Sequence, residues 1–115
     1  MLTITTLKEF GANTDEGLGR CLGNEELYFK LVRMIPDDAN FEGLKEAVSA
    51  GDLDKAFEHA HALKGVLANL SLTPIAEKAS EITELLRART EMDYTELLDE
   101  LPALREELVK ILDEE

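Results

Sequence analysis

The sequence is poor in residues that could form disulfides, zinc sites or membrane spans. Its 115 residues include a single cysteine, Cys21, so the chain cannot form an internal disulfide, and a structural zinc site would lack a second sulfur ligand. We expect Cys21 to pack as a small hydrophobe in an early helix. No run approaches the roughly 18 apolar residues of a membrane span, and Met1–Ile4 does not resemble a secretion signal. We therefore expect a cytoplasmic protein with neither a membrane segment nor a bound metal.

Basic side chains are also scarce. Lysine and arginine total 12 against 25 aspartates and glutamates, which gives a formal net charge of −13. A charge of this sign and size repels nucleic acids and anionic lipid headgroups. We therefore expect proteins as partners, not nucleic acid or membrane, and we expect the chain itself to be a monomer.

Strand patterns are absent from the sequence as well. No segment of five or more residues alternates between apolar and polar, whereas apolar residues recur at three- and four-residue spacing nearly throughout. At 115 residues the chain suits one domain, residues 1–115. The spacing predicts helices at about 3–10, 15–22, 24–35, 38–50, 52–71, 74–90 and 94–113. We predict an all-α fold in which the last four or five helices form an up-down bundle.

Apolar stripes and helix-ending residues support this assignment. One stripe comprises Ile75, Ala79, Ile82 and Leu86, and another comprises Leu97, Leu101, Leu104, Leu108 and Ile111. Asp52 and Thr73 are expected to cap the helices that follow them, with Pro74 at a first helical position. Pro102 lies inside the last helical pattern, so it should kink or split that helix.

The helix predicted over residues 52–71 separates into two faces when its residues are placed at about 100° intervals. The apolar face, which should join the core, contains Leu53, Ala56, Phe57, Ala60, Leu63 and Leu67. The opposite face contains Asp54, Glu58, His61, Gly65 and Asn69. His61 should therefore project into solvent from the middle of a helix.

The neighbours of His61 on this helix make it a candidate functional residue. Lys64, Gly65 and Ala68 follow His61 by three, four and seven residues, so all three should lie beside its imidazole. Glycine inside a helix is about 1 kcal/mol less favourable than alanine, so an exposed one suggests a role other than stability. Gly65 would leave room for a phosphoryl group or for the backbone of a partner.

An imidazole in this setting can carry a phosphoryl group. A histidine ring has an ordinary pKa of about 6.5, so near neutral pH a ring nitrogen is available to attack an acyl phosphate and form phosphohistidine. Phosphoryl transfer needs in-line positioning and charge neutralisation, and Lys64 could supply one positive charge. The carboxylate that gives or takes the phosphoryl group, and Mg²⁺, would come from the partner. We therefore expect no cofactor in this chain.

The segment Ala60–Gly65, which reads AHALKG, resembles the A-H-x-L-K-G signature of histidine-containing phosphotransfer (HPt) domains. Asn69 and Leu70 also stand where that family often has the same pair. The similarity extends from about residue 16 to residue 112, and it includes the entry segment 20–28. The chain departs from the family pattern at Leu67, where a smaller residue is frequent, and at Ser71, where glycine is common. The end of this helix is therefore expected to pack differently.

The resemblance implies a four-helix bundle in which His61 is the phosphoacceptor and Lys64 and Gly65 support it. It also implies a role as a phosphorelay intermediate of two-component signalling, with receiver domains of response regulators or hybrid histidine kinases as partners. We expect Ala62 and Ala68, with Asn69 beside them, to form part of the docking surface for a receiver helix. The chain would be a covalent carrier and not an enzyme, because it contains no phosphate-binding loop, nucleophile elbow or kinase nucleotide site.

The same residues allow three other interpretations. His59 has Ala62 and Leu63 as its neighbours one turn on, so it is the weaker candidate for acceptor and is expected to be a flanking surface residue. Glu58 and His61 form a Glu-x-x-His pair, as in di-iron bundles, but such sites need the pair twice. The remaining alternative is an acidic helical adaptor that binds proteins without any chemistry.

Overall fold

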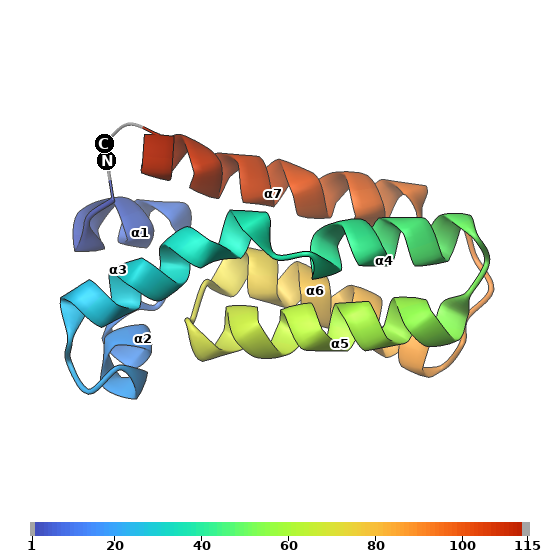
Figure 1. The fold of residues 1–115 in the computed structure, drawn as a ribbon, viewed down its shortest axis with the longest axis horizontal. Helices are drawn as coiled ribbons and strands as arrows, with labels where there is room; N and C mark the ends of the chain where they lie inside the picture. The colour runs from blue at the N-terminus through green and yellow to red at the C-terminus, as the bar shows by residue number, and fades with distance from the viewer. Residues whose placement is uncertain (1, 114–115) are drawn as a thin grey trace.

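The computed structural model describes residues 2–113, and the secondary structure of these residues is helical (Figure 1). The α-helices are α1 (Ile4–Phe10), α2 (Thr14–Arg20), α3 (Glu25–Met34), α4 (Asn40–Ser49), α5 (Leu53–Asn69), α6 (Thr73–Arg87) and α7 (Thr95–Asp113), and a short 3-10 helix, η1 (Ile35–Asp37), follows α3. Residues 2–113 contain no strand. The predicted all-α fold is therefore confirmed, with helix ends within three residues of those expected.

The four C-terminal helices α4–α7 lie along the longest dimension of the molecule (Figure 1). Each contacts the next one in the sequence, α4 with α5, α5 with α6, and α6 with α7. Helix α4 also lies beside α7: the guanidinium of Arg105 on α7 is 5.0 Å from the ring centroid of Phe41 on α4. The short connections between these helices favour contact between sequence neighbours.

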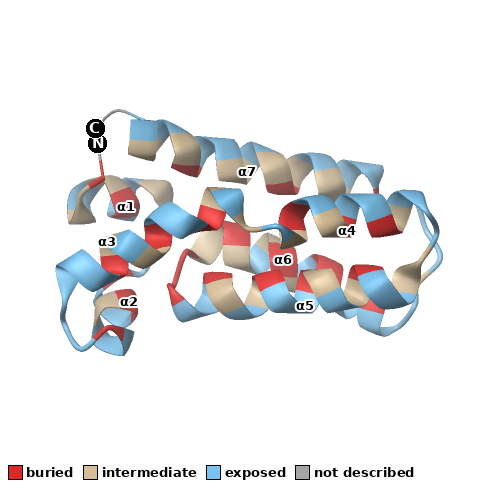
Figure 2. Ribbon diagram, viewed as in Figure 1, coloured by how far each residue is buried: buried red, intermediate tan, exposed pale blue. Residues whose placement is uncertain are grey.

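The core lies between these helices, on the faces that Figure 2 shows as buried. All four residues of the predicted α6 stripe are buried, as expected from its spacing. In α7 only Leu101 and Leu108 of the predicted stripe are buried, whereas the other three residues are half-buried. The face of α7 that packs on the bundle is therefore narrower than its apolar pattern suggests.

The three N-terminal helices gather at one end of the bundle (Figure 1). Tyr28 of α3 is fully buried, and its hydroxyl donates a hydrogen bond to the carbonyl oxygen of Leu70, 2.8 Å away. Arg20 of α2 donates to the carbonyl oxygen of Ala68 and to Ser71 Oγ. Cys21 is buried as expected, although it is the residue after α2 and not, as predicted, part of a helix. The N-terminal segment is thus bound to the end of α5.

Two expectations about helix ends need correction. Asp52 caps α5 as predicted, because its carboxylate accepts the backbone N–H of Lys55. Thr73, however, is the first residue of α6 and not its cap: Leu72 occupies the cap position, and the Thr73 hydroxyl donates to the carbonyl oxygen of Ser71. Of the two outcomes predicted at Pro102, a kink or a split, the split is excluded, since α7 continues through this residue.

None of the helices in residues 2–113 has the length and apolar character needed to cross a membrane. Within the same residues, no three histidine, cysteine, aspartate or glutamate side chains come together in a way that could hold a metal ion.

Candidate functional site

Helix α5 places the candidate residues on its outer face. Four of the six residues predicted for its core face, Ala56, Ala60, Leu63 and Leu67, are fully buried, and the other two, Leu53 and Phe57, are half-buried. The five residues predicted for the opposite face, Asp54, Glu58, His61, Gly65 and Asn69, are all exposed. This division confirms the helical plot of the sequence, because burial of one stripe fixes the rotation of the whole helix. The predicted exposure of His61 at mid-helix is therefore confirmed.

The imidazole of His61 is stacked on a phenyl ring. The ring centroids of Phe57 and His61 are 5.4 Å apart, with 23° between the ring planes. Phe57 precedes His61 by one helical turn and is half-buried, so it reaches from the edge of the core to the imidazole. Phe57 was predicted only as a core residue, although its four-residue spacing from His61 is a signal for this contact.

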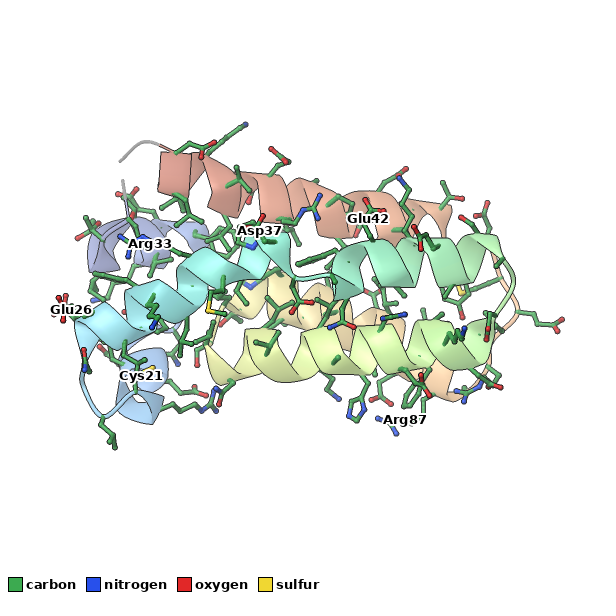
Figure 3. All side chains as sticks on the ribbon, viewed as in Figure 1. Cys21, Glu26, Arg33, Asp37, Glu42 and Arg87 are labelled. Carbon is green, nitrogen blue, oxygen red and sulfur yellow. The ribbon has the colours of Figure 1, made fainter. Side chains whose placement is uncertain are left out.

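Two arginines lie over the same phenyl ring. The guanidinium carbon of Arg87 is 5.0 Å from the Phe57 centroid, and that of Arg89 is 5.1 Å from it. Figure 3 shows the Arg87 side chain at the edge of α5 that faces away from α4 and α7. Sequence reasoning missed both arginines, because they belong to the end of α6 and the residues after it and reach α5 only in the folded chain.

The ammonium group of Lys64 is held by a carboxylate of α6. Lys64 Nζ lies 3.3 Å from Glu84 Oε1, and the other carboxylate oxygen, Oε2, accepts a hydrogen bond from Arg87 Nε at 3.2 Å. The hydrogen bond from Lys64, followed by the charge of Arg87, lowers the pKa of the Glu84 carboxyl group. Helical spacing alone places Lys64 beside His61, whereas its partner Glu84 comes from another helix and has no signal in the sequence.

The surface around Gly65 is open. A Cβ atom added to Gly65 would meet no atom within 4 Å, apart from its own helical turn. Ala62, Ala68 and Asn69, the other residues expected to face a partner, are all exposed. Beside them, Lys64 and Ala68 line one wall of a shallow groove between α5 and α6. Nothing in residues 2–113 therefore blocks access to this stretch of α5.

His59 has a different environment from the one expected. It is half-buried, and its Nδ1 donates a hydrogen bond to Asn40 Oδ1, 2.8 Å away on α4. A Cβ atom on Gly43 would come within 2.5 Å of the His59 ring, so the glycine makes room for it. His59 is thus packed between α4 and α5 and is not a free surface residue.

The two departures from the family pattern have structural explanations. Ser71 has a φ angle of 54°, in the left-handed region that favours glycine. The backbone N–H groups of Ser71 and Leu72 donate to the carbonyls of Ala68 and Leu67, which is the hydrogen-bond pattern of a Schellman ending. Leu67 is fully buried, so its larger side chain fills the core and not the outer face.

Comparison with known proteins agrees with this geometry. The family model described as the Hpt domain matches residues 34–113. The match covers most of the chain but starts later than the resemblance noted from the sequence, so α1, α2 and nearly all of α3 lie outside it. No curated protein and no solved structure matched the chain. The chain belongs to the Hpt domain family, whose members have a phosphotransfer role in two-component signalling.

Proposed function

We propose that the protein is a phosphorelay intermediate that accepts a phosphoryl group on His61 from an aspartyl phosphate of one receiver domain and passes it to another receiver. The observation that carries this proposal is the exposed imidazole at the middle of α5, within a segment of the family signature and with Lys64 one turn away. His59 is the weaker candidate because its ring is engaged by Asn40 and packed against Gly43.

The transfer needs only groups that this chain and a receiver supply. The lone pair of a neutral His61 ring nitrogen forms a bond to phosphorus while the bond from phosphorus to the aspartyl oxygen breaks, and the electron pair leaves on the carboxylate. The second transfer reverses these steps on another receiver. Lys64 neutralises charge on the phosphoryl oxygens, and the Mg²⁺ expected for the reaction belongs to the receiver. The chain is therefore a phosphocarrier and not a kinase.

The docking surface surrounds the acceptor. We assign Ala62, Gly65, Ala68 and Asn69 to it, because all four are exposed on the outer face of α5. Small side chains there allow a receiver helix to approach the imidazole closely, as in-line attack requires. The absence of any obstacle within 4 Å of a Cβ on Gly65 supports this assignment.

The scaffold of the proposal is an up-down antiparallel four-helix bundle built from α4–α7, with the short helices α1–α3 packed at one end. We propose that residues 1–115 form one domain and act as a cytoplasmic monomer. The hydrogen bonds from Arg20 and Tyr28 to the end of α5 support a single folding unit, because they join the N-terminal helices to the bundle.

The test is transfer of radioactive phosphate from a phosphorylated receiver domain. The wild-type chain and His59→Gln should take up label that is stable to alkali and labile to acid, as phosphohistidine is. His61→Gln should take up none, while its circular dichroism spectrum remains helical. If the wild type takes up no label from any receiver tested, the protein is instead an adaptor without chemistry.

A further inference from the structure

A series of contacts through α6 connects the residues on the two sides of His61. On one side, Lys64 Nζ lies 3.3 Å from Glu84, and Glu84 in turn accepts from Arg87 Nε at 3.2 Å. On the other side, the guanidinium of Arg87 lies over the ring of Phe57, which stacks on His61. One carboxylate therefore pairs with two cations: Lys64, one helical turn after His61, and Arg87, which lies over the phenyl ring that stacks on His61.

These ion pairs are well placed to rearrange. The side chains of Glu84 and Arg87 are 55% and 51% exposed, and that of Lys64 is 34% exposed. Exposed ion pairs contribute little to stability and exchange readily with other charged partners. A phosphoryl group carries up to two negative charges and three acceptor oxygens, so it competes strongly with one carboxylate for lysine and arginine.

Resting on the proposed function of His61, we propose that Arg87 is a second cation, besides Lys64, that binds the phosphoryl group. Glu84 competes with the phosphoryl group for both cations. Before transfer, the Glu84 carboxylate keeps Lys64 and Arg87 beside the imidazole. When His61 is phosphorylated, the two cations turn to the phosphoryl oxygens, and the nearby carboxylate then repels the modified ring. Arg87 thus stabilises the phosphohistidine and Glu84 destabilises it, which adjusts how readily the group is passed on.

Arg89 provides a matched control on the same ring. Its guanidinium is 5.1 Å from the Phe57 centroid, about as close as that of Arg87. However, its Nε donates to Asp54 at 2.7 Å, and its Nη1 donates to the carbonyl oxygen of Leu86 at 2.6 Å. Because Asp54 lies two turns before His61 on α5, Arg89 is held away from the phosphoryl position.

The experiment measures the equilibrium between the phosphorylated receiver and the phosphorylated chain for three single variants. Removing one unit charge near a doubly charged group should change this equilibrium by about three- to tenfold at low ionic strength. Glu84→Gln should shift it toward phosphorylated His61, and Arg87→Gln should shift it toward the receiver. Arg89→Gln should change it by less than about twofold, because Asp54 and the carbonyl oxygen of Leu86 already hold this guanidinium.

The opposite signs distinguish the proposal from a structural role. Glu84 and Arg87 form one ion pair, so if the pair only held α6 in place, both substitutions would move the equilibrium in the same direction. Shifts of the same sign, or no shift in either variant, would overturn the proposal. If the wild-type chain takes up no phosphoryl group at all, the proposed function itself is wrong. If the wild type is phosphorylated but the variants show an unchanged equilibrium, only the role of Glu84 and Arg87 is wrong.

Discussion

Gly17 lies directly against the ring of Tyr28. A Cβ atom on residue 17 would come 2.7 Å from Cε1 of that ring and 2.8 Å from the carbonyl oxygen of Leu70. The same carbonyl accepts the hydrogen bond of the Tyr28 hydroxyl. Helices α2 and α3 and the end of α5 therefore meet at one tightly packed point, where the N-terminal helices join the bundle.

We expect Gly17→Ala to lower the free energy of unfolding by about 1–3 kcal/mol, because a methyl group there overlaps a buried ring and a backbone carbonyl. Gly19→Ala is the matched control on the same helix, since a Cβ atom at Gly19 meets nothing within 4 Å. The control should be neutral or up to about 1 kcal/mol more stable, because alanine favours the helix. Urea unfolding of both variants measures the difference, and equal stabilities would contradict the packing described.

The buried hydroxyl of Tyr28 should make stability depend on pH in the alkaline range. Burial, and then the nearby charge of Cys21, raises the pKa of Tyr28 from 10.0 to about 12. Because the folded pKa is the higher one, the stabilisation is fully present below the unfolded pKa and is lost as the pH rises from about 10 to about 12. Across that window, wild-type stability should fall more steeply than that of Tyr28→Phe, by up to about 1.4 kcal/mol per pH unit. Parallel slopes for the two proteins would refute this assignment.

Gly65 should prove more important for transfer than for folding. Gly65→Ala is expected to raise the free energy of unfolding by about 0.5–1 kcal/mol, because the site is helical and open. Gly65→Gln should fold normally yet slow phosphoryl transfer, since the long side chain covers the approach to His61. Gly19→Gln, also at an open helical position, should transfer at the wild-type rate. If Gly65→Gln transfers the phosphoryl group as fast as the wild type, Gly65 has no steric role in transfer.

Ser71→Gly should stabilise the chain. Ser71 has a left-handed backbone with a φ of 54°, which is unfavourable for residues with a Cβ atom. The substitution also removes the hydrogen bond of 3.2 Å from Arg20 to Ser71 Oγ, but the exposed arginine can bind water instead. We expect a net gain of about 0.5–1 kcal/mol in thermal or urea unfolding. A clear loss of stability would mean that the Arg20 contact dominates.

Features confined to one helix could be predicted from the sequence. The exposure of His61 and the burial of Leu63 follow from 3.6 residues per turn once one stripe is known to face the core. The same rule places Lys64 and Gly65 beside His61, and neither position depends on how α5 meets its neighbours.

Contacts between helices could not be predicted in this way. The pairing of Lys64 with Glu84, and the hydrogen bond from His59 to Asn40, depend on the rotation and axial shift of one helix against another. Apolar periodicity specifies which face is buried but not these two parameters. The cap expected at Thr73 was wrong for a related reason: Leu72 is fully buried, and the turn that buries it takes the cap position.

The most direct test of the central claim is an NMR spectrum of the imidazole nitrogens before and after phosphoryl transfer from a receiver domain. The chain has two histidines, so His59→Gln assigns both sets of ring signals. We predict that the ring-nitrogen signals of His61 shift on phosphorylation while those of His59 keep their positions. Shifted His59 signals, or phosphoryl uptake with both rings unchanged, would contradict the account.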